Sequence, residues 1–185
     1  MHYDHDEDEP PGEPLVAPDR PLPADVPGHF TSIADVAEEH WHSPKGKYST
    51  HCRDLSLALG GKRNADVAHG GHPFDLQIRR ITAGAAVCPY HHHSAQWECF
   101  VFLSGRGRVR TPEGFRAVGP GDIVLHPPGA PHQTIADVDS ELECLIVTDN
   151  PTEDVFFYPD SNKWGTRLGG KLFRISEVDY FDGEE

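Results

Sequence analysis

Short runs of apolar residues alternate with glycine and proline between residues 74 and 148, at intervals of about eight to twelve residues. The runs are rich in Val, Ile, Phe and Leu, which favour strands, and the breaks contain residues typical of turns. This rhythm predicts an antiparallel sandwich or barrel. The predicted strands cover residues 74–82, 87–93, 98–103, 108–111, 115–118, 122–126, 132–136 and 141–148.

The stretches on either side of this region differ from it in composition. The N-terminal stretch holds seven of the 17 prolines, and six acids lie within its first 13 residues, which predicts an acidic, disordered arm. The next stretch is expected to form an extension with a short helix, capped by Thr31 or Ser32. The C-terminal stretch is expected to pack on the barrel. The expected divisions are the arm at 1–28, the N-terminal extension at 29–73, the barrel core at 74–148 and the C-terminal extension at 149–185.

The formal charge of -14 is concentrated at the two ends of the chain. Eleven of the 30 acids lie within the first 13 or the last nine residues, so the region between them is nearly balanced. This distribution, without a basic face, argues against a nucleic-acid partner. No apolar run reaches the ~18 to 20 residues that span a membrane, and no secretory signal is recognisable. We therefore expect no membrane partner and a cytoplasmic location.

Histidine is abundant in the chain, and the densest group is His91-His92-His93. Because side chains alternate along a strand, His91 and His93 share one face while His92 points to the other. Glu98 opens the next predicted strand, and His132 starts a later one. Three imidazoles and one carboxylate on neighbouring strands suit one divalent transition metal ion. The predicted ligands are His91, His93, Glu98 and His132, and the predicted ion is Fe, Mn, Ni, Co or Zn.

The spacing of these residues resembles the two sequence motifs of the cupin superfamily. The first motif contains Gly, His-x-His, Glu and Gly, and the second contains Gly, Pro-x-Gly, His and Asn. The positions that match in register are His91, His93, Glu98, Gly105, Gly121, Pro127, Gly129 and His132. Gly84 stands one residue too early, and Ala136 replaces the closing Asn. The resemblance implies a small, single-domain, all-β cupin with a double-stranded β-helix (jelly-roll) barrel and a metal inside it.

What the resemblance implies about function is a mononuclear metal-binding cupin, a metalloenzyme that acts on a small organic molecule. Fe(II)-dependent dioxygenase chemistry is slightly favoured, and a sugar isomerase or epimerase is the alternative. A third hypothesis is a cupin that binds a small ligand without turnover, since one scaffold serves many purposes. The pattern assigns no catalytic acid or base.

Two further expectations concern the cavity and the assembly. Arg79 and Arg80 are consecutive on a predicted strand, so one of them faces the interior, where it would hold an anionic substrate. Trp97 is expected to face away from Glu98. The strand edges of a small barrel, together with both extensions, predict a homodimer.

Overall fold

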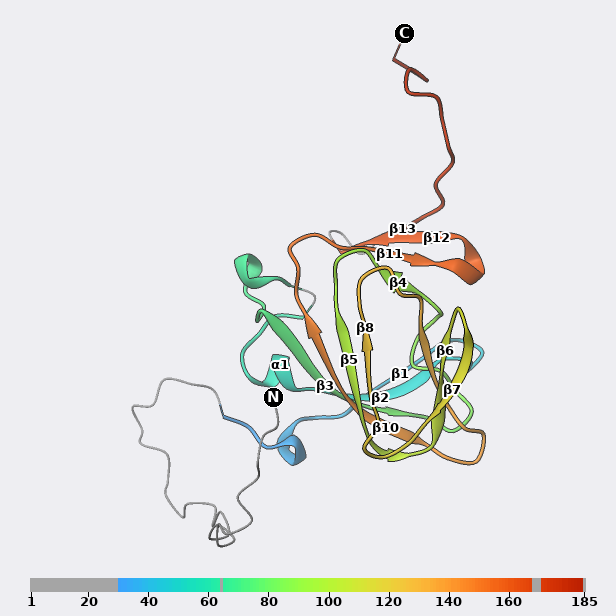
Figure 1. The fold of residues 1–185 in the computed structure, drawn as a ribbon. Coiled ribbons are helices and arrows are strands. Elements are labelled where there is room, and N and C mark those ends of the chain that lie inside the picture. The colour runs from blue at the N-terminus through green and yellow to red at the C-terminus, as the bar shows by residue number, and fades with distance from the viewer. Residues whose placement is uncertain (1–29, 64, 168–170, 185) are drawn as a thin grey trace, which may run out of the picture.

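The computed structural model describes residues 30–63, 65–167 and 171–184, so the arm predicted over 1–28 lies outside the described residues. The largest sheet has the strand order β1-β2-β3-β10-β5-β8 and is antiparallel throughout (Figure 1). Its strands are β1 (Glu39–His42), β2 (Ser49–Asp54), β3 (Phe74–Ile81), β10 (Leu142–Asp149), β5 (Glu98–Gly105) and β8 (Ile123–His126).

Two smaller sheets complete the described strands. A three-stranded sheet has the order β7-β6-β9, and a four-stranded sheet has the order β13-β12-β11-β4. Their strands are β6 (Gly107–Thr111), β7 (Gly114–Val118), β9 (Gln133–Ala136), β4 (His92–His93), β11 (Val155–Tyr158), β12 (Lys163–Thr166) and β13 (Leu172–Phe173). The helical elements are α1 (Leu55–Ala58) and 3-10 turns at Ile33–Asp35, Val67–His69 and Pro159–Ser161. The predicted all-β, double-stranded β-helix class is confirmed.

The main apolar core lies between the six-stranded and three-stranded sheets. Its members come from both, and the most deeply buried side chains include Phe102 of β5, Leu142 of β10 and Val109 of β6. Burial of this kind stabilises a fold by roughly 25 cal/mol per Å² of apolar surface. The core therefore fills one end of the barrel and leaves the other end available for polar residues.

The inner face of the large sheet changes from apolar to polar along its strands. At the core end, Leu142 pairs with both Ile81 and Gly105, and all three positions are apolar. At the opposite end, Thr148 pairs with both Asp75 and Glu98. Because side chains alternate in direction along each strand, these rows face the same interior. This polar end of the barrel is where β4 and β11 lie (Figure 1).

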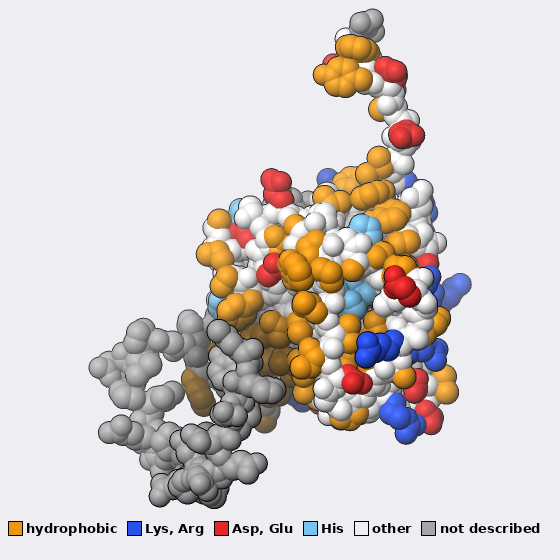
Figure 2. Space-filling model, in the orientation of Figure 1, with side chains coloured by type: hydrophobic (Ala, Val, Ile, Leu, Met, Phe, Trp, Pro, Cys, Tyr) orange, Lys and Arg blue, Asp and Glu red, His pale blue; other side chains and the backbone are white. Residues whose placement is uncertain are grey.

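The outer face of the same sheet is covered only in part. The helix α1 and the turn before β1 bury a second apolar cluster, Val36, Leu55 and Ile78, against β3. By contrast, Ile123 and Leu125 on the edge strand β8 are 67% and 55% exposed. Apolar side chains are accordingly exposed on the face shown in Figure 2.

The predicted short N-terminal helix, capped by Thr31 or Ser32, is not confirmed. Ser32 does cap a turn, since its Oγ accepts a hydrogen bond from the amide of Ala34, but the turn is a single 3-10 turn at Ile33–Asp35. The chain then becomes β1, in which Trp41 pairs with Thr50 of β2. Pairing with a sheet edge satisfies every second backbone group of β1, and this outweighs a helical preference that is weak over so few residues.

The C-terminal segment packs on the barrel through its strands and then leaves it. Strand β11 pairs with β4, so that Phe156 lies opposite His93 and Phe157 opposite His92. Beyond β13 the chain extends away from the barrel (Figure 1) and its apolar side chains, such as Tyr180, are exposed. The division of the chain at residues 73 and 148 stays a prediction. Among the described residues, no helix is long and apolar enough to cross a membrane.

Gly105 closes β5 in a conformation that only glycine tolerates here. Its φ is +81°, and a Cβ at this position would lie 1.8 Å from the carbonyl oxygen of Glu141. Gly121 has a similar φ of +89° but no atom within 4 Å of such a Cβ. We expect Gly105→Ala to reduce the free energy of unfolding by about 3 kcal/mol or more, and Gly121→Ala by about 1 kcal/mol. Urea denaturation measures both; equal losses would show that the close contact is relieved without cost.

Candidate metal centre

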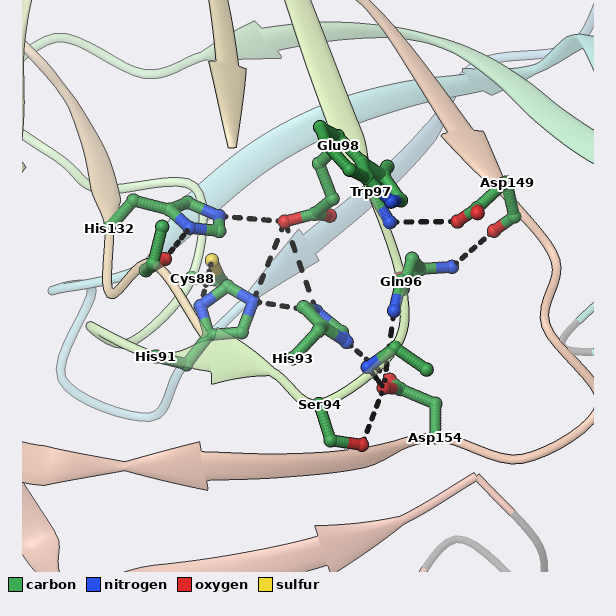
Figure 3. Close-up of polar contacts among 12 residues, drawn as sticks. Cys88, His91, His93, Ser94, Gln96, Trp97, Glu98, His132, Asp149 and Asp154 are labelled. Atoms are coloured by element: carbon green, nitrogen blue, oxygen red, sulfur yellow. Dashed lines mark hydrogen bonds and ion pairs between the residues drawn. The ribbon is translucent and has the colours of Figure 1, made fainter. Parts of the chain in front are cut away.

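The four predicted ligands are brought together by strand pairing at the polar end of the barrel. His91 and His132 form an isolated antiparallel bridge, in which each backbone amide donates to the other residue's carbonyl oxygen (3.1 and 2.8 Å). His93 lies on β4, two residues beyond His91, and Glu98 is the first residue of β5. Figure 3 shows the three imidazoles pointing toward the Glu98 carboxylate.

The potential ligand atoms lie within a few ångströms of one another. Nε2 of His91 and Nε2 of His93 are 3.1 Å apart. The Glu98 Oε2 atom lies 2.6 Å from Nε2 of His132, 3.8 Å from Nε2 of His93 and 3.9 Å from Nε2 of His91. His91, His93 and Glu98 form a group whose ligand atoms all lie within 4.8 Å, and His132 adjoins this group through Glu98.

In His91 and His132, the hydrogen bond of Nδ1 determines which ring nitrogen is free to bind a metal ion. Nδ1 of His91 lies 2.9 Å from the carbonyl oxygen of Pro89, and Nδ1 of His132 lies 3.0 Å from that of Ala130. Since a carbonyl oxygen only accepts, Nδ1 must carry the proton in both rings. In a neutral ring Nε2 is then an acceptor, and its lone pair points toward Glu98. Backbone geometry thus sets these two tautomers in the form that binds a metal.

Burial and neighbouring charges set the protonation of the cluster. Burial lowers the pKa of the His91 imidazole to about 4, so this ring is neutral at neutral pH. Burial also opposes ionisation of Glu98, but the interaction with His132 and the two other imidazoles outweighs it, and the pKa of the carboxyl is lowered to about 2. Burial disfavours the charged form of His93 as well, yet the Asp154 carboxylate raises the pKa of that imidazole. A proton on Nε2 of His93 would leave when an ion binds.

This donor set fits a divalent transition metal ion. Glu98 Oε2 and His132 Nε2 are buried and have no hydrogen-bond partner among the described residues. Two ligands at right angles around an ion with bonds of about 2.1 Å lie ~3 Å apart, close to the 3.1 Å between His91 and His93. Imidazole and carboxylate together suit Fe, Mn, Ni, Co or Zn more than Mg or Ca. The residues therefore form a possible metal site.

Asp154, which precedes β11, is a site residue that the sequence reasoning missed. Its buried carboxylate lies 2.5 Å from Nδ1 of His93 and accepts hydrogen bonds from the Ser94 hydroxyl (3.2 Å) and the Ala95 amide (2.9 Å). Figure 3 shows it at the turn that joins β4 to β5. A carboxylate behind a ligating histidine orients the ring and increases its basicity. Asp154 therefore holds His93 in place.

Replacing Asp154 with asparagine is expected to weaken metal binding by about 10- to 100-fold. The amide keeps the size of the side chain but removes the charge that favours a proton on Nδ1 of His93. Competition with a chromophoric chelator would measure the affinity. Asp160→Asn is the matched control, because Asp160 pairs with Arg110 at the surface (2.7 Å). An unchanged affinity in Asp154→Asn would contradict this role.

Aromatic rings enclose the remaining sides of the cluster. His126 of β8 is buried and stacks on His132 with ring centroids 3.8 Å apart. Burial lowers the pKa of His126 to about 3, so this ring stays neutral. The ring of Tyr158 in β11 stacks on that of His91, with the ring centroids 5.9 Å apart. These contacts limit the freedom of the rings that face Glu98.

A cavity of about 390 Å³ opens beside the cluster. Its lining residues come from β3, β5 and β10 on one side and from β4, β11 and β12 on the other. Arg79 lines this cavity, whereas Arg80 points outward and pairs with Glu38 and Glu141. The prediction that one of these two arginines faces the interior is confirmed. Trp97 faces away from the cavity and is 46% exposed.

The fold and the cluster define a class: a β-barrel with three imidazoles and one carboxylate at one end of its interior. The sequence profile of the family described as "Cupin domain" matches residues 77–148. Residues 77–148 of the chain therefore match a cupin domain, as the two motifs predict. No curated protein sequence matches the chain.

Solved structures with the same fold share little sequence with this chain. A protein from Acidithiobacillus ferrooxidans assigned as a sugar phosphate isomerase is 23% identical, with a TM-score of 0.66 over 80% of this chain and 92% of that chain. A sugar phosphate isomerase from Silicibacter pomeroyi is 18% identical, with a TM-score of 0.65 over 82% and 97%. The polyketide cyclase RemF from Streptomyces resistomycificus is 23% identical, with a TM-score of 0.51 over 66% and 79%. At these identities, the similarity shows the fold alone.

Proposed function

We propose that this chain is a mononuclear metalloenzyme that acts on a small, polar organic molecule. The observation that carries the proposal is the convergence of four buried or nearly buried groups, His91, His93, Glu98 and His132, of which the first three line a cavity. Such a cluster is costly to bury unless a cation binds it. Its place beside a cavity of about 390 Å³ gives a small substrate access to the ion.

The chain's own residues have separate parts in this proposal. A bound divalent ion would supply Lewis-acid chemistry or, as Fe(II), the capacity to bind O2. Glu98 supplies negative charge, and the backbone acceptors behind His91 and His132 keep those rings in the ligating tautomer. Tyr158 covers one face of His91 and excludes water from it. Gln77 and Gln96 line the cavity and offer hydrogen bonds that would orient a substrate.

Two reaction types remain within this proposal, and the cavity lining favours one of them. The sequence slightly favoured dioxygenase chemistry on an aromatic or enolisable compound. The cavity is lined by Arg79, Gln77 and Gln96, which suit a polar or charged substrate. The isomerase-type alternative therefore has the stronger support, and the names of the two most extensively matched structures cited above agree with it. A ligand-binding cupin without turnover is the third outcome.

Elemental analysis of protein purified without added metal, followed by two assays, tests the proposal. We expect about one transition metal ion per chain. Sugar phosphates are then incubated in deuterated water, where an isomerase incorporates deuterium, and catechols and diketones are screened for O2 uptake. Deuterium incorporation supports the isomerase, and substrate-dependent O2 uptake supports the dioxygenase. Protein that contains no metal and binds none when Zn, Mn, Fe, Co or Ni is added would reject the proposal.

We also propose that the chain forms a homodimer through the outer face of β5 and β8. Leu103, Ile123 and Leu125 are exposed there, although side chains of this kind are usually buried. Light scattering is expected to give the mass of a dimer for the wild type and of a monomer for Ile123→Lys. Val138→Lys, in an exposed turn, is the control that keeps the dimer. A monomeric wild type would contradict the proposal. The cytoplasmic location and the lack of a nucleic-acid partner stay predictions.

A further inference from the structure

Two arginines line the cavity next to the metal centre, and they come from different parts of the chain. Arg79 lies on β3, and its Nε and Nη2 atoms donate to Oε1 of Gln77 (3.0 and 2.8 Å). Arg167 follows β12, and its guanidinium donates to the side-chain oxygen of Asn150 and to the carbonyl oxygen of Pro151. All of these acceptors are neutral, so none of them balances the charge of either arginine.

Most of the other described arginines are paired with a carboxylate. Six of them lie within 4.0 Å of a carboxylate oxygen: Arg53, Arg63, Arg80, Arg106, Arg108 and Arg110. Within the described part of the chain, neither Arg79 nor Arg167 has such a partner. In addition, Nε of Arg167 is buried without a hydrogen-bond partner among those residues. A buried donor of a charged group that lacks an acceptor is costly, which indicates that an acceptor is supplied from outside the chain.

The carboxylates that line the cavity do not neutralise these arginines. Glu98 faces the three histidines, and Asp154 accepts hydrogen bonds from His93 and the loop after β4. Asp75 lies on β3 in the same cross-strand row as Glu98, and no ion pair joins it to either arginine among the described residues. The three carboxylates are thus engaged or out of range. The charge of Arg79 and Arg167 is available to a ligand in the cavity.

The size of the cavity sets the length of that ligand. Strand β10 separates β3, which carries Arg79, from β5, which carries Glu98. Adjacent strands lie ~4.8 Å apart, so the two side chains start on strands roughly 10 Å apart. A volume of about 390 Å³ holds a small metabolite with several polar groups. One molecule can therefore contact the metal centre and the arginines together.

We propose that Arg79 and Arg167 form a subsite for the carboxylate or phosphate group of the substrate. This inference rests on the proposed function, because the other end of the same molecule contacts the metal ion. Guanidinium groups bind both kinds of oxyanion through paired, charge-assisted hydrogen bonds. The substrate class is therefore a small organic acid or phosphate ester with a metal-binding oxygen at the opposite end.

Calorimetric titration of the full chain with inorganic phosphate and with malonate tests the subsite. Each anion is titrated into protein as purified and after dialysis against EDTA, since an anion can also ligate a metal ion. We expect the dialysed wild type to bind at least one of them, and the tighter of the two identifies the phosphate or the carboxylate. Arg79→Gln and Arg167→Gln are each expected to weaken this binding by about tenfold or more. Arg80→Gln, on the outer face of β3, is expected to leave it unchanged.

Two further measurements separate this inference from its alternatives. Arg167→Lys keeps the charge and is expected to bind more tightly than Arg167→Gln, and circular dichroism shows whether each variant is folded. If Arg167→Gln does not fold, Arg79→Gln and Arg167→Lys decide the result. Metal content is measured in every sample: wild type that holds no metal as purified and takes none up when it is added, but that still binds the anion, rejects the proposed function and keeps the subsite. Binding that disappears on dialysis, or that is equal in the folded arginine variants, overturns the subsite.

Discussion

Glu98→Gln is expected to bind the metal ion with a Kd more than about a hundredfold higher than that of the wild type. Loss of a group that only orients a ligand weakens metal binding by about 10- to 100-fold, and Glu98 is itself a predicted ligand. Glutamine has the same shape, but it carries no charge. Its amide nitrogen would also donate to Nε2 of His132, which lies 2.6 Å from the carboxylate in the wild type. The ring would then use its lone pair on a hydrogen bond instead of an ion. Competition titration against a chelator of known affinity measures the change.

Glu141→Gln provides the matched control for this experiment. Glu141 directly precedes β10 of the large sheet, and its carboxylate pairs with Arg80 at the surface (3.0 Å). Its replacement is expected to leave metal affinity unchanged. If Glu98→Gln and Glu141→Gln bind the ion equally well, Glu98 is no ligand, and the centre would have to be assigned to the histidines alone.

Metal binding is also expected to stabilise the folded chain strongly. An ion that binds only the folded state adds RT ln(1 + [L]/Kd), which is about 4 kcal/mol when the free ion exceeds Kd a thousandfold. For a chain of 185 residues this corresponds to a rise of roughly 10 °C in Tm. The effect should be large because Glu98 Oε2 and His132 Nε2, which are buried without a hydrogen-bond partner among the described residues, would gain a bond to the ion. Thermal unfolding with excess metal and with EDTA measures it.

The same scan on Glu98→Gln distinguishes binding at this centre from binding elsewhere. The variant is expected to unfold at the same temperature with and without metal. A rise in Tm that persists in Glu98→Gln would place the ion at another group of side chains, for example at the exposed histidines His40 and His42 of β1.

The grouping of the four predicted ligands could be read from the sequence because each step has a short-range cause. Side-chain alternation separates His91 and His93 from His92, and the structure gives His92 a different neighbour, Phe157. His132 follows a turn rich in proline and glycine at residues 127–131, whose geometry is local. Most strands between residues 74 and 148 were predictable for the same reason, but the strand predicted at 87–93 is reduced to the two residues of β4. Strand pairing then adds the long-range part, since the bridge between His91 and His132 closes the cluster.

The residues that the sequence did not reveal act across long separations. Asp154 lies 61 residues from its partner His93, in a stretch without a motif, and only the pairing of β11 with β4 brings the two together. Arg167 reaches the cavity through the hairpin of β11 and β12. The predicted N-terminal helix was not confirmed for a related reason. Strand β1 pairs with β2, and local helix propensity takes no account of such a partner. The sequence signal for such residues is an aspartate, glutamate or arginine directly before or after a strand that is expected to pair beside the site.

The pairing of β4 with β11 has a consequence for how the protein can be dissected. The family profile ends at residue 148, yet the carboxylate that orients His93 and the second cavity arginine both lie beyond it. A fragment cut at that boundary would retain all four predicted ligands but lose the strand against which β4 is held. Truncation, fusion or grafting of this barrel must therefore keep residues 149–167 together with the region that the profile matches, a piece larger than the domain that sequence comparison delimits.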